Sequence, residues 1–221
     1  MTPTLAALRA SALAFSPVPD QPDPSWRVLE LATAPAIDLA LPAHRDAAHA
    51  WLNAWGCRIR KPRPGEPRVF DAAIADWWDG WSAELPEPGA WLADLADDRL
   101  DALAACFTAL ATSPAAPTRT LGPTAASKLL FALRPKALMP WDNLIAQGLH
   151  GARDGRAYRA HLATGRAWAR AVLAEASAEA SGVVAEPALV AGLGRTGWSL
   201  AKVLDEYCYL VHTRGWVPPA G

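Results

Sequence analysis

One segment of the chain, residues 121–142, places a carboxylate and an amine where they could do acid–base chemistry. A glycine–proline pair opens an apolar helical stretch, a proline turn follows, and Pro140 and Trp141 precede Asp142 at the expected start of another helix. Backbone N–H groups and the helix dipole stabilise a carboxylate anion at such a position. If Trp141 shields it from water, Asp142 becomes a stronger general base.

The amine in this segment belongs to Lys128, on the helix that precedes the turn. It would either pair with Asp142 or bind an anionic group of a substrate. We therefore predict Asp142 and Lys128 as catalytic residues, with Trp141 and Asn143 contacting the substrate. A structural alternative stays open, in which Asp142 is only an N-cap worth about 1 kcal/mol and Lys128 is a solvated helix residue.

A second group of candidate residues lies in the proline-broken loop at 57–68. The loop contains one acid, Glu66, and five cations, which are Arg58, Arg60, Lys61, Arg63 and Arg68. Arginine forks bind phosphate, sulfate or carboxylate in bidentate fashion. We predict that Arg58, Arg60, Lys61 and Arg63 form an anion clamp for a small anionic molecule. The alternative is a solvated charged loop.

Tryptophan is the third feature, because the chain has eleven. Trp77 and Trp78 are adjacent on a predicted helix, and aromatic walls stack bases or line small-ligand pockets. We predict both as substrate contacts. Their helical spacing leaves core packing as the alternative.

No motif indicates a metal or a cofactor. The five histidines form no HExxH pattern, and no nucleophile elbow or phosphate-binding glycine loop is present. Three widely spaced cysteines form neither a disulfide framework nor a CxxC pair, which favours free thiols in a reducing compartment. We expect catalysis, if any, to need neither metal nor cofactor.

Composition limits the partners and the location. The net charge is −1, which argues against a general nucleic-acid coat or a polybasic membrane binder and leaves DNA as a less favoured partner. No apolar run reaches the ~18 residues of a membrane span, and the first residues predict an amphipathic helix rather than a signal peptide. We expect a cytoplasmic protein, and the richness in Ala, Arg, Pro and Trp is associated with GC-rich bacterial genomes.

Helical periodicity dominates the chain and predicts an all-α protein with one globular domain over residues 1–221. We expect residues 16–25 to form a proline-rich connector and 216–221 a loose tail. The expected helices cover 4–15, 26–32, 42–55, 69–85, 90–111, 122–133, 143–149, 154–180 and a last helix from Thr196 to before Gly215. Residues 113–120 are expected to be a loop.

The order of residues in segment 121–142 resembles the helix-hairpin-helix family of base-excision DNA glycosylases. The similarity lies in Gly122-Pro123, Thr124-Ala125-Ala126, the apolar helix, Arg134-Pro135 and Pro140-Trp141-Asp142. It is closer still to bacterial proteins that carry Ser-Lys-x-Leu, a proline turn and Pro-x-Trp-Asp. The resemblance implies a glycosylase-like helical fold with Asp142 at the reaction centre.

The chain also departs from the family pattern. The hairpin's second glycine is missing, and Thr124 stands where bifunctional members have a Schiff-base lysine. We therefore expect the fold to carry over more readily than the reaction.

Three functions follow as hypotheses. The first is a small-molecule enzyme of secondary metabolism, with a carboxylate base and an anion clamp, for example closing a ring when an amine displaces sulfate or phosphate. The second is a DNA glycosylase that stacks a flipped base on tryptophan. The third is a non-catalytic subunit of a heteromeric complex, with exposed tryptophans as contact points.

Overall fold

The computed structural model describes residues 2–15 and 23–218, and it confirms the all-α prediction. The described α-helices are α1 (Leu5–Phe15), α2 (Pro24–Ala32), α3 (Pro42–Ala54), α4 (Val69–Trp81), α5 (Asp97–Thr112), α6 (Pro123–Leu133), α7 (Asn143–His150), α8 (Gly155–Glu179), α9 (Glu186–Gly192) and α10 (Leu200–Cys208). Short 3-10 turns follow α4 (Ser82–Glu84) and precede α5 (Leu92–Asp94), and a π-helical turn, η3 (Tyr209–Thr213), continues α10.

Proline and short polar side chains set the helix ends. A proline occupies the first turn of α2, α3, α6 and α9, where its missing N–H has no partner to lose. Asp142, Asp154 and Ser199 each accept a backbone N–H at the start of α7, α8 and α10. Of the expected connector, residues 16–22 lie outside the described residues, and Asp23 caps α2.

Three local features differ from the prediction. Residues 113–120 do not form a plain loop, because β1 (Pro114–Ala116) and β2 (Arg119–Thr120) pair as a small antiparallel hairpin. Helix α9 was not expected, and α10 starts at Leu200 rather than Thr196 because Ser199 provides the cap. Trp216 donates its backbone N–H to Leu210, and its ring packs on Tyr207, so the start of the expected tail is held.

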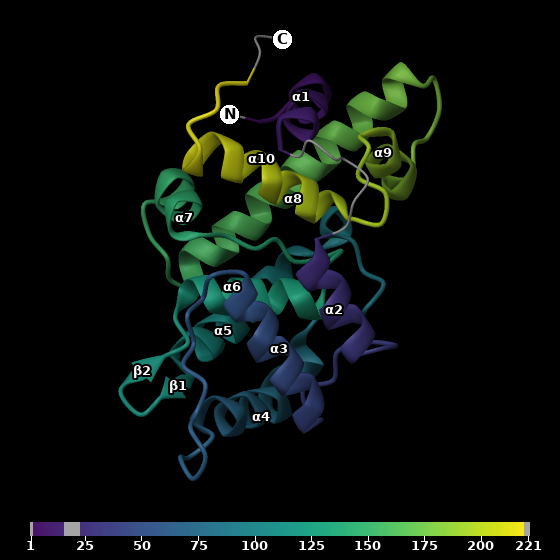
Figure 1. Ribbon diagram of the computed structural model, residues 1–221. Helices are drawn as coiled ribbons and strands as arrows, with labels where there is room; N and C mark the ends of the chain where they lie inside the picture. The colour runs from purple at the N-terminus through teal and green to yellow at the C-terminus, as the bar shows by residue number, and fades with distance from the viewer. Residues whose placement is uncertain (1, 16–22, 219–221) are drawn as a thin grey trace.

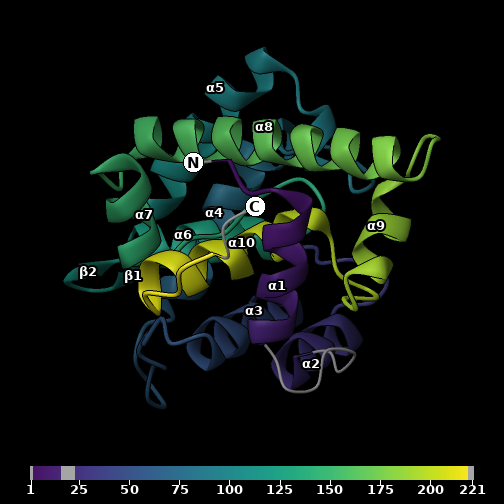
Figure 2. The ribbon, with the colours of Figure 1, turned by 90° about the horizontal axis from the view of Figure 1, so that it is seen from above.

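The helices form two groups (Figure 1). Helices α1 and α7–α10 lie in the upper group of that view, and α2–α6 with the hairpin lie below. Packing of α5 against α8 joins the groups, and α1 packs on α10, so the first and last described helices are neighbours. Seen from above, α8 runs along one edge with α1 and α10 beside it (Figure 2).

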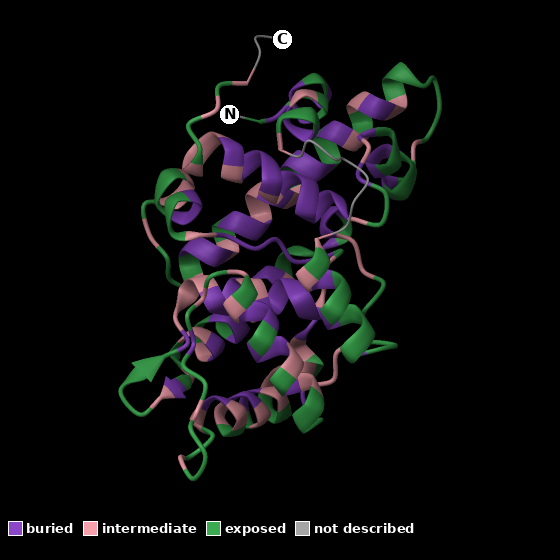
Figure 3. Cartoon of the chain, viewed as in Figure 1, coloured by how far each residue is buried: buried purple, intermediate pink, exposed green. Residues whose placement is uncertain are grey.

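Buried residues occur in both groups and along the boundary between them (Figure 3). Most of helix α6 is buried, including the run Leu129–Leu133, which explains why the second half of its sequence is entirely apolar. Trp141, Tyr158 and Phe107 are the largest fully buried side chains, and they meet where the turn after α6 crosses α5 and α8. In the described part of the chain, no helix combines the length and apolar character needed to cross a bilayer.

Candidate functional site

Asp142 is the N-cap of α7, as predicted, and both of its carboxylate oxygens have donors. Oδ1 accepts the backbone N–H of Ile145 at 2.8 Å, and Oδ2 accepts the hydroxyl of Thr213 at 2.8 Å. Thr213 lies in η3, so the carboxylate fastens the end of the chain to the start of α7. This geometry fits a structural cap, and a substrate proton could reach Oδ2 only in competition with the Thr213 hydroxyl.

Lys128 has a separate partner. Its Nζ donates to the backbone carbonyl of Trp55 at 2.6 Å and lies 5.6 Å from the centre of the Trp55 ring. Trp55 is the C-cap of α3, where a cation satisfies a free carbonyl and complements the helix dipole. Among the described residues, no hydrogen bond or ion pair joins Lys128 to Asp142.

The rest of the segment fixes the turn between α6 and α7. The hydroxyl of Ser127 bonds the backbone of Trp141, and the indole N–H of Trp141 donates to the carbonyl of Pro123. The Trp141 ring is 1% exposed, so it packs in the core and offers no face to a ligand, contrary to the substrate contact that we expected. Asn143 is exposed at the first position of α7.

Two histidines complete this buried region. His161 Nε2 lies 3.1 Å from the carbonyl of Pro140, and its Nδ1 lies 3.2 Å from His150 Nε2. Since Nε2 must donate to the carbonyl, Nδ1 of a neutral His161 accepts from His150. Burial lowers the pKa of His161 to about 3, so its ring is neutral at physiological pH.

Sequence reasoning missed an ionic cluster on α10. Lys202 Nζ lies 3.0 Å from Asp205 and 3.5 Å from Glu206, and Arg195 pairs with Glu206. Burial disfavours the ammonium ion, but the two carboxylates outweigh it and raise the pKa of Lys202. The i, i+3 and i+4 spacing of these residues was the available signal, although it does not reveal burial.

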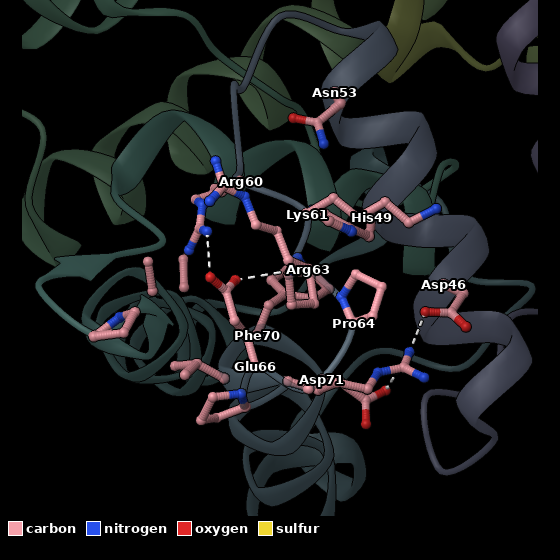
Figure 4. Close-up of a pocket in the computed structure, with 18 of the residues that line it drawn as sticks. Asp46, His49, Asn53, Arg60, Lys61, Arg63, Pro64, Glu66, Phe70 and Asp71 are labelled. Carbon is pink, nitrogen blue, oxygen red and sulfur yellow. Dashed lines mark hydrogen bonds and ion pairs between the residues drawn. The ribbon is translucent and has the colours of Figure 1, made fainter.

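The loop at 57–68 folds back against α3, the start of α4 and β1, and encloses a pocket of about 630 Å³ (Figure 4). That volume is in the range of small-molecule sites. We call it the basic pocket, and its walls include Asp46, His49, Asn53, Arg60, Lys61, Arg63, Glu66, Arg68, Phe70 and Asp71.

Two cations of the basic pocket are neutralised by carboxylates. Arg60 pairs with Glu66 at 2.7 Å, and Arg68 pairs with Asp46. The hydrogen bond from Arg60 lowers the pKa of Glu66, so this carboxylate is an anion at neutral pH. In the described residues, neither Lys61 nor the guanidinium of Arg63 makes an ion pair.

The basic pocket also receives the N-terminus of α4. Arg68 is the N-cap, and its side chain makes no capping hydrogen bond. The first N–H groups of a helix have no intrahelical acceptor, and this end of the helix dipole is positive. Val69 and Phe70, at the first two helical positions, line the pocket together with Lys61 and Arg63, so the start of the helix and these cations border the same space.

Helix α3 shapes the loop that carries these cations. Asn53 donates to the carbonyl of Ile59 at 2.9 Å and accepts the N–H of Ile59 at 2.6 Å, and His49 Nε2 bonds the same carbonyl. His49 stacks on Phe70, which links α3 to α4. His49 and Asn53 were not predicted as site residues, although their four-residue spacing places them on one face of α3.

The predicted clamp and the predicted catalytic residues lie in different places. Arg60, Lys61 and Arg63 line the basic pocket, whereas Arg58, Lys128 and Asp142 are not among its lining residues. In Figure 1 the loop leaves the end of α3 near α6 and descends beside β1 to the start of α4. The structure therefore divides the single site that we expected into a basic pocket and a separate structural junction.

The tryptophans are largely packing residues. All eleven fall within the described residues, and none is classed as exposed. Trp77 is 4% exposed and donates its indole N–H to the carbonyl of Cys106, and Trp78 is half-buried beside it. Trp77 does line a second hollow next to the basic pocket, as does Trp81.

The described residues contain no group of three or more His, Cys, Asp or Glu side chains that could hold a metal ion. Cys57, Cys106 and Cys208 are free thiols. Burial raises the pKa of all three thiols, which disfavours the nucleophilic thiolate.

Comparison of the chain with protein-family models, with curated protein sequences and with solved structures gave no match. The resemblance to helix-hairpin-helix glycosylases stays a prediction based on segment 121–142.

Proposed function

We propose that the protein binds a small anionic molecule in the basic pocket. The observation that carries this proposal is that, among the described residues, the side chains of Lys61 and Arg63 make no ion pair in a small-molecule-sized pocket that also receives the uncapped N-terminus of α4. A phosphate, sulfate or carboxylate group would supply the missing charge and accept the free backbone N–H groups.

The arrangement of charge supports a small ligand over DNA. Asp46, Glu66 and Asp71 stand among the cations of the pocket, and each would repel a phosphate chain that passed over it. A small anion meets fewer of these carboxylates than a phosphate chain does, because it can bind the side chains of Lys61 and Arg63 alone.

Isothermal titration with inorganic pyrophosphate tests this function. We expect saturable binding to the wild type and at least a tenfold loss of affinity in the double variant Lys61→Ala/Arg63→Ala. Arg58→Ala is the matched control, because Arg58 belongs to the same loop, is exposed and does not line the pocket. Equal binding by all three proteins would refute the proposal.

Binding of a labelled DNA duplex with an abasic-site analogue tests the DNA glycosylase alternative. Tight binding that weakens steeply with salt, together with no binding of pyrophosphate, would favour the DNA glycosylase alternative instead.

Catalysis by Asp142 stays a separate prediction. The ring-closing reaction needs its base and its anion clamp at one site, and the structure places Asp142 outside the basic pocket. Asp142→Asn keeps an oxygen to cap α7 and removes the base, so unchanged turnover of any substrate that is found would exclude this role. The partner-subunit alternative also stays a separate prediction, and its contact points would have to be half-buried tryptophans such as Trp78 and Trp81.

A further inference from the structure

The second hollow, of about 580 Å³, adjoins the basic pocket, and the two share walls. Pro67, Arg68 and Val69 line both. Strand β1 also borders both, with Pro114 on the second hollow and Ala115 and Ala116 on the basic pocket. The two spaces therefore meet at the start of α4.

The second hollow differs in chemistry from the first, and we call it the tryptophan hollow. Its other walls are Ala72, Ala73, Asp76, Trp77, Trp81, Ala109 and Ser113. Trp81 is half-buried, so part of its ring is accessible, whereas Trp77 is almost fully covered. Small side chains around one accessible indole suit a flat apolar group.

Charge is distributed unequally between the basic pocket and the tryptophan hollow. Asp76 is exposed at the tryptophan hollow and would repel an anion there. Arg68, on the shared wall, pairs with Asp46 and lies 3.6 Å from Asp71, both of which line the basic pocket. Lys61 and Arg63, whose side chains make no ion pair within the described residues, line the basic pocket alone.

We propose that the basic pocket and the tryptophan hollow form one site, whose ligand places an anionic group near Lys61 and Arg63 and an aromatic group against Trp81. The proposal rests on the function proposed above and names its substrate class, which is an aryl or similarly apolar phosphate or sulfate. Asp76 fixes the orientation, because the uncharged end of such a ligand is the end it tolerates.

The test compares two probes that share one anionic group. Methyl phosphate reports the basic pocket alone, and 1-naphthyl phosphate adds an aromatic ring. By isothermal titration, we expect the wild type to prefer the naphthyl ester by roughly tenfold, which is the scale of one stacking contact. Trp81→Leu should bring this ratio close to one and leave the affinity for methyl phosphate unchanged.

Matched variants distinguish the loss of the stacking contact from a general loss of folding. Ala72→Glu adds a carboxylate at an exposed helical position of the hollow and should weaken the naphthyl ester selectively even if Trp81→Leu folds poorly. Ala83→Glu is its control, because Ala83 is exposed and lines neither space. Trp91→Leu controls for the loss of a half-buried tryptophan outside the site.

The outcomes distinguish the two proposals. Equal wild-type affinity for both probes, or a preference that survives both Trp81→Leu and Ala72→Glu, would overturn the combined site while the anion-binding function stands. If neither probe nor pyrophosphate binds, both proposals fail.

Discussion

The ammonium group of Lys202 lies 5.3 Å from the centre of the Trp55 ring and joins α10 to the end of α3. Lys128 approaches the same ring at 5.6 Å and donates to the Trp55 carbonyl. Trp55 therefore receives two cations from two different helices. Phe15 and Trp198 also lie within 6 Å of the Lys202 ammonium, so three aromatic rings surround this buried charge. Because α3 and α10 belong to different helix groups, these contacts hold the groups together.

Replacing Lys202 with methionine should destabilise the protein strongly. The variant keeps the length of the side chain but leaves Asp205 and Glu206 buried with less compensation. Breaking a buried ion pair from one side costs about 3–5 kcal/mol. Urea denaturation should show this loss in the free energy of unfolding. Lys136→Met is the control, because Lys136 is exposed over Trp91, and a similar loss there would contradict the argument.

Asp142 should show the signature of a structural cap. Asp142→Ala removes the acceptors for Ile145 N–H and the Thr213 hydroxyl, and loss of a cap costs about 1 kcal/mol, with a further contribution from the second bond. Asp142→Asn keeps an acceptor for the cap and should lose less. Thermal denaturation of both variants measures the difference, and an asparagine variant as unstable as the alanine variant would show that charge matters more than capping.

The sequence predicted the elements marked by local chemistry. Most helix positions follow from proline, from short polar caps and from apolar periodicity, and the Asp142 cap is the clearest example. It missed α9 because that helix is short and has no side-chain cap. It missed the hairpin because Pro114 and Pro117 favour an open loop.

The site was predicted in part. Charge density pointed to Arg60, Lys61 and Arg63, which do line a pocket. Residue types alone do not show which of these cations pairs with Glu66, or that Ala115 and Ala116 of β1 form part of the pocket wall. The contacts of Trp141 and Lys128 could not be predicted for a related reason, since their partners come from distant parts of the chain. Tertiary contacts decide which polar side chains are left without a hydrogen-bond or ion-pair partner. The spacing of residues along the sequence does not reveal these contacts.

Acid should destabilise the protein through His161. The pKa of its buried ring is lowered to about 3, against ~6.5 for the unfolded chain, so the folded state binds fewer protons between these values. Stability from this residue is present above pH ~6.5 and is lost progressively as the pH falls toward 3. His161→Gln, which keeps a donor for the Pro140 carbonyl, should be less stable at pH 7 and approach the wild type at pH 4.

Urea midpoints at pH 7, 6, 5 and 4 provide the measurement for His161. Parallel losses in the wild type and the variant over this range would show that the acid sensitivity comes from other groups. Both His150 and His212 have pKa values lowered chiefly by burial, so part of the slope should survive in His161→Gln.

Glu186 should act in the opposite direction, with stability lost as the pH rises toward neutral. Burial is the main reason that its pKa is raised to about 7, against ~4.5 for the unfolded chain, although the Leu200 N–H bonded to Oε1 favours the anion. Its other oxygen, Oε2, is buried without a hydrogen-bond partner in the described residues. The folded state therefore binds more protons than the unfolded state between these values, and stability falls as the pH rises through 7.

Glu186→Gln removes this titration and keeps an oxygen for Leu200. We expect the variant to melt at a higher temperature than the wild type at pH 8.5 and to lose that advantage at pH 5. Glu87→Gln reports the effect of removing one exposed carboxylate. Equal changes in the melting temperatures of Glu186→Gln and Glu87→Gln at both pH values would contradict this expectation. That result would mean that ionising Glu186 costs no folding free energy, and that its protonation does not couple α9 to α10.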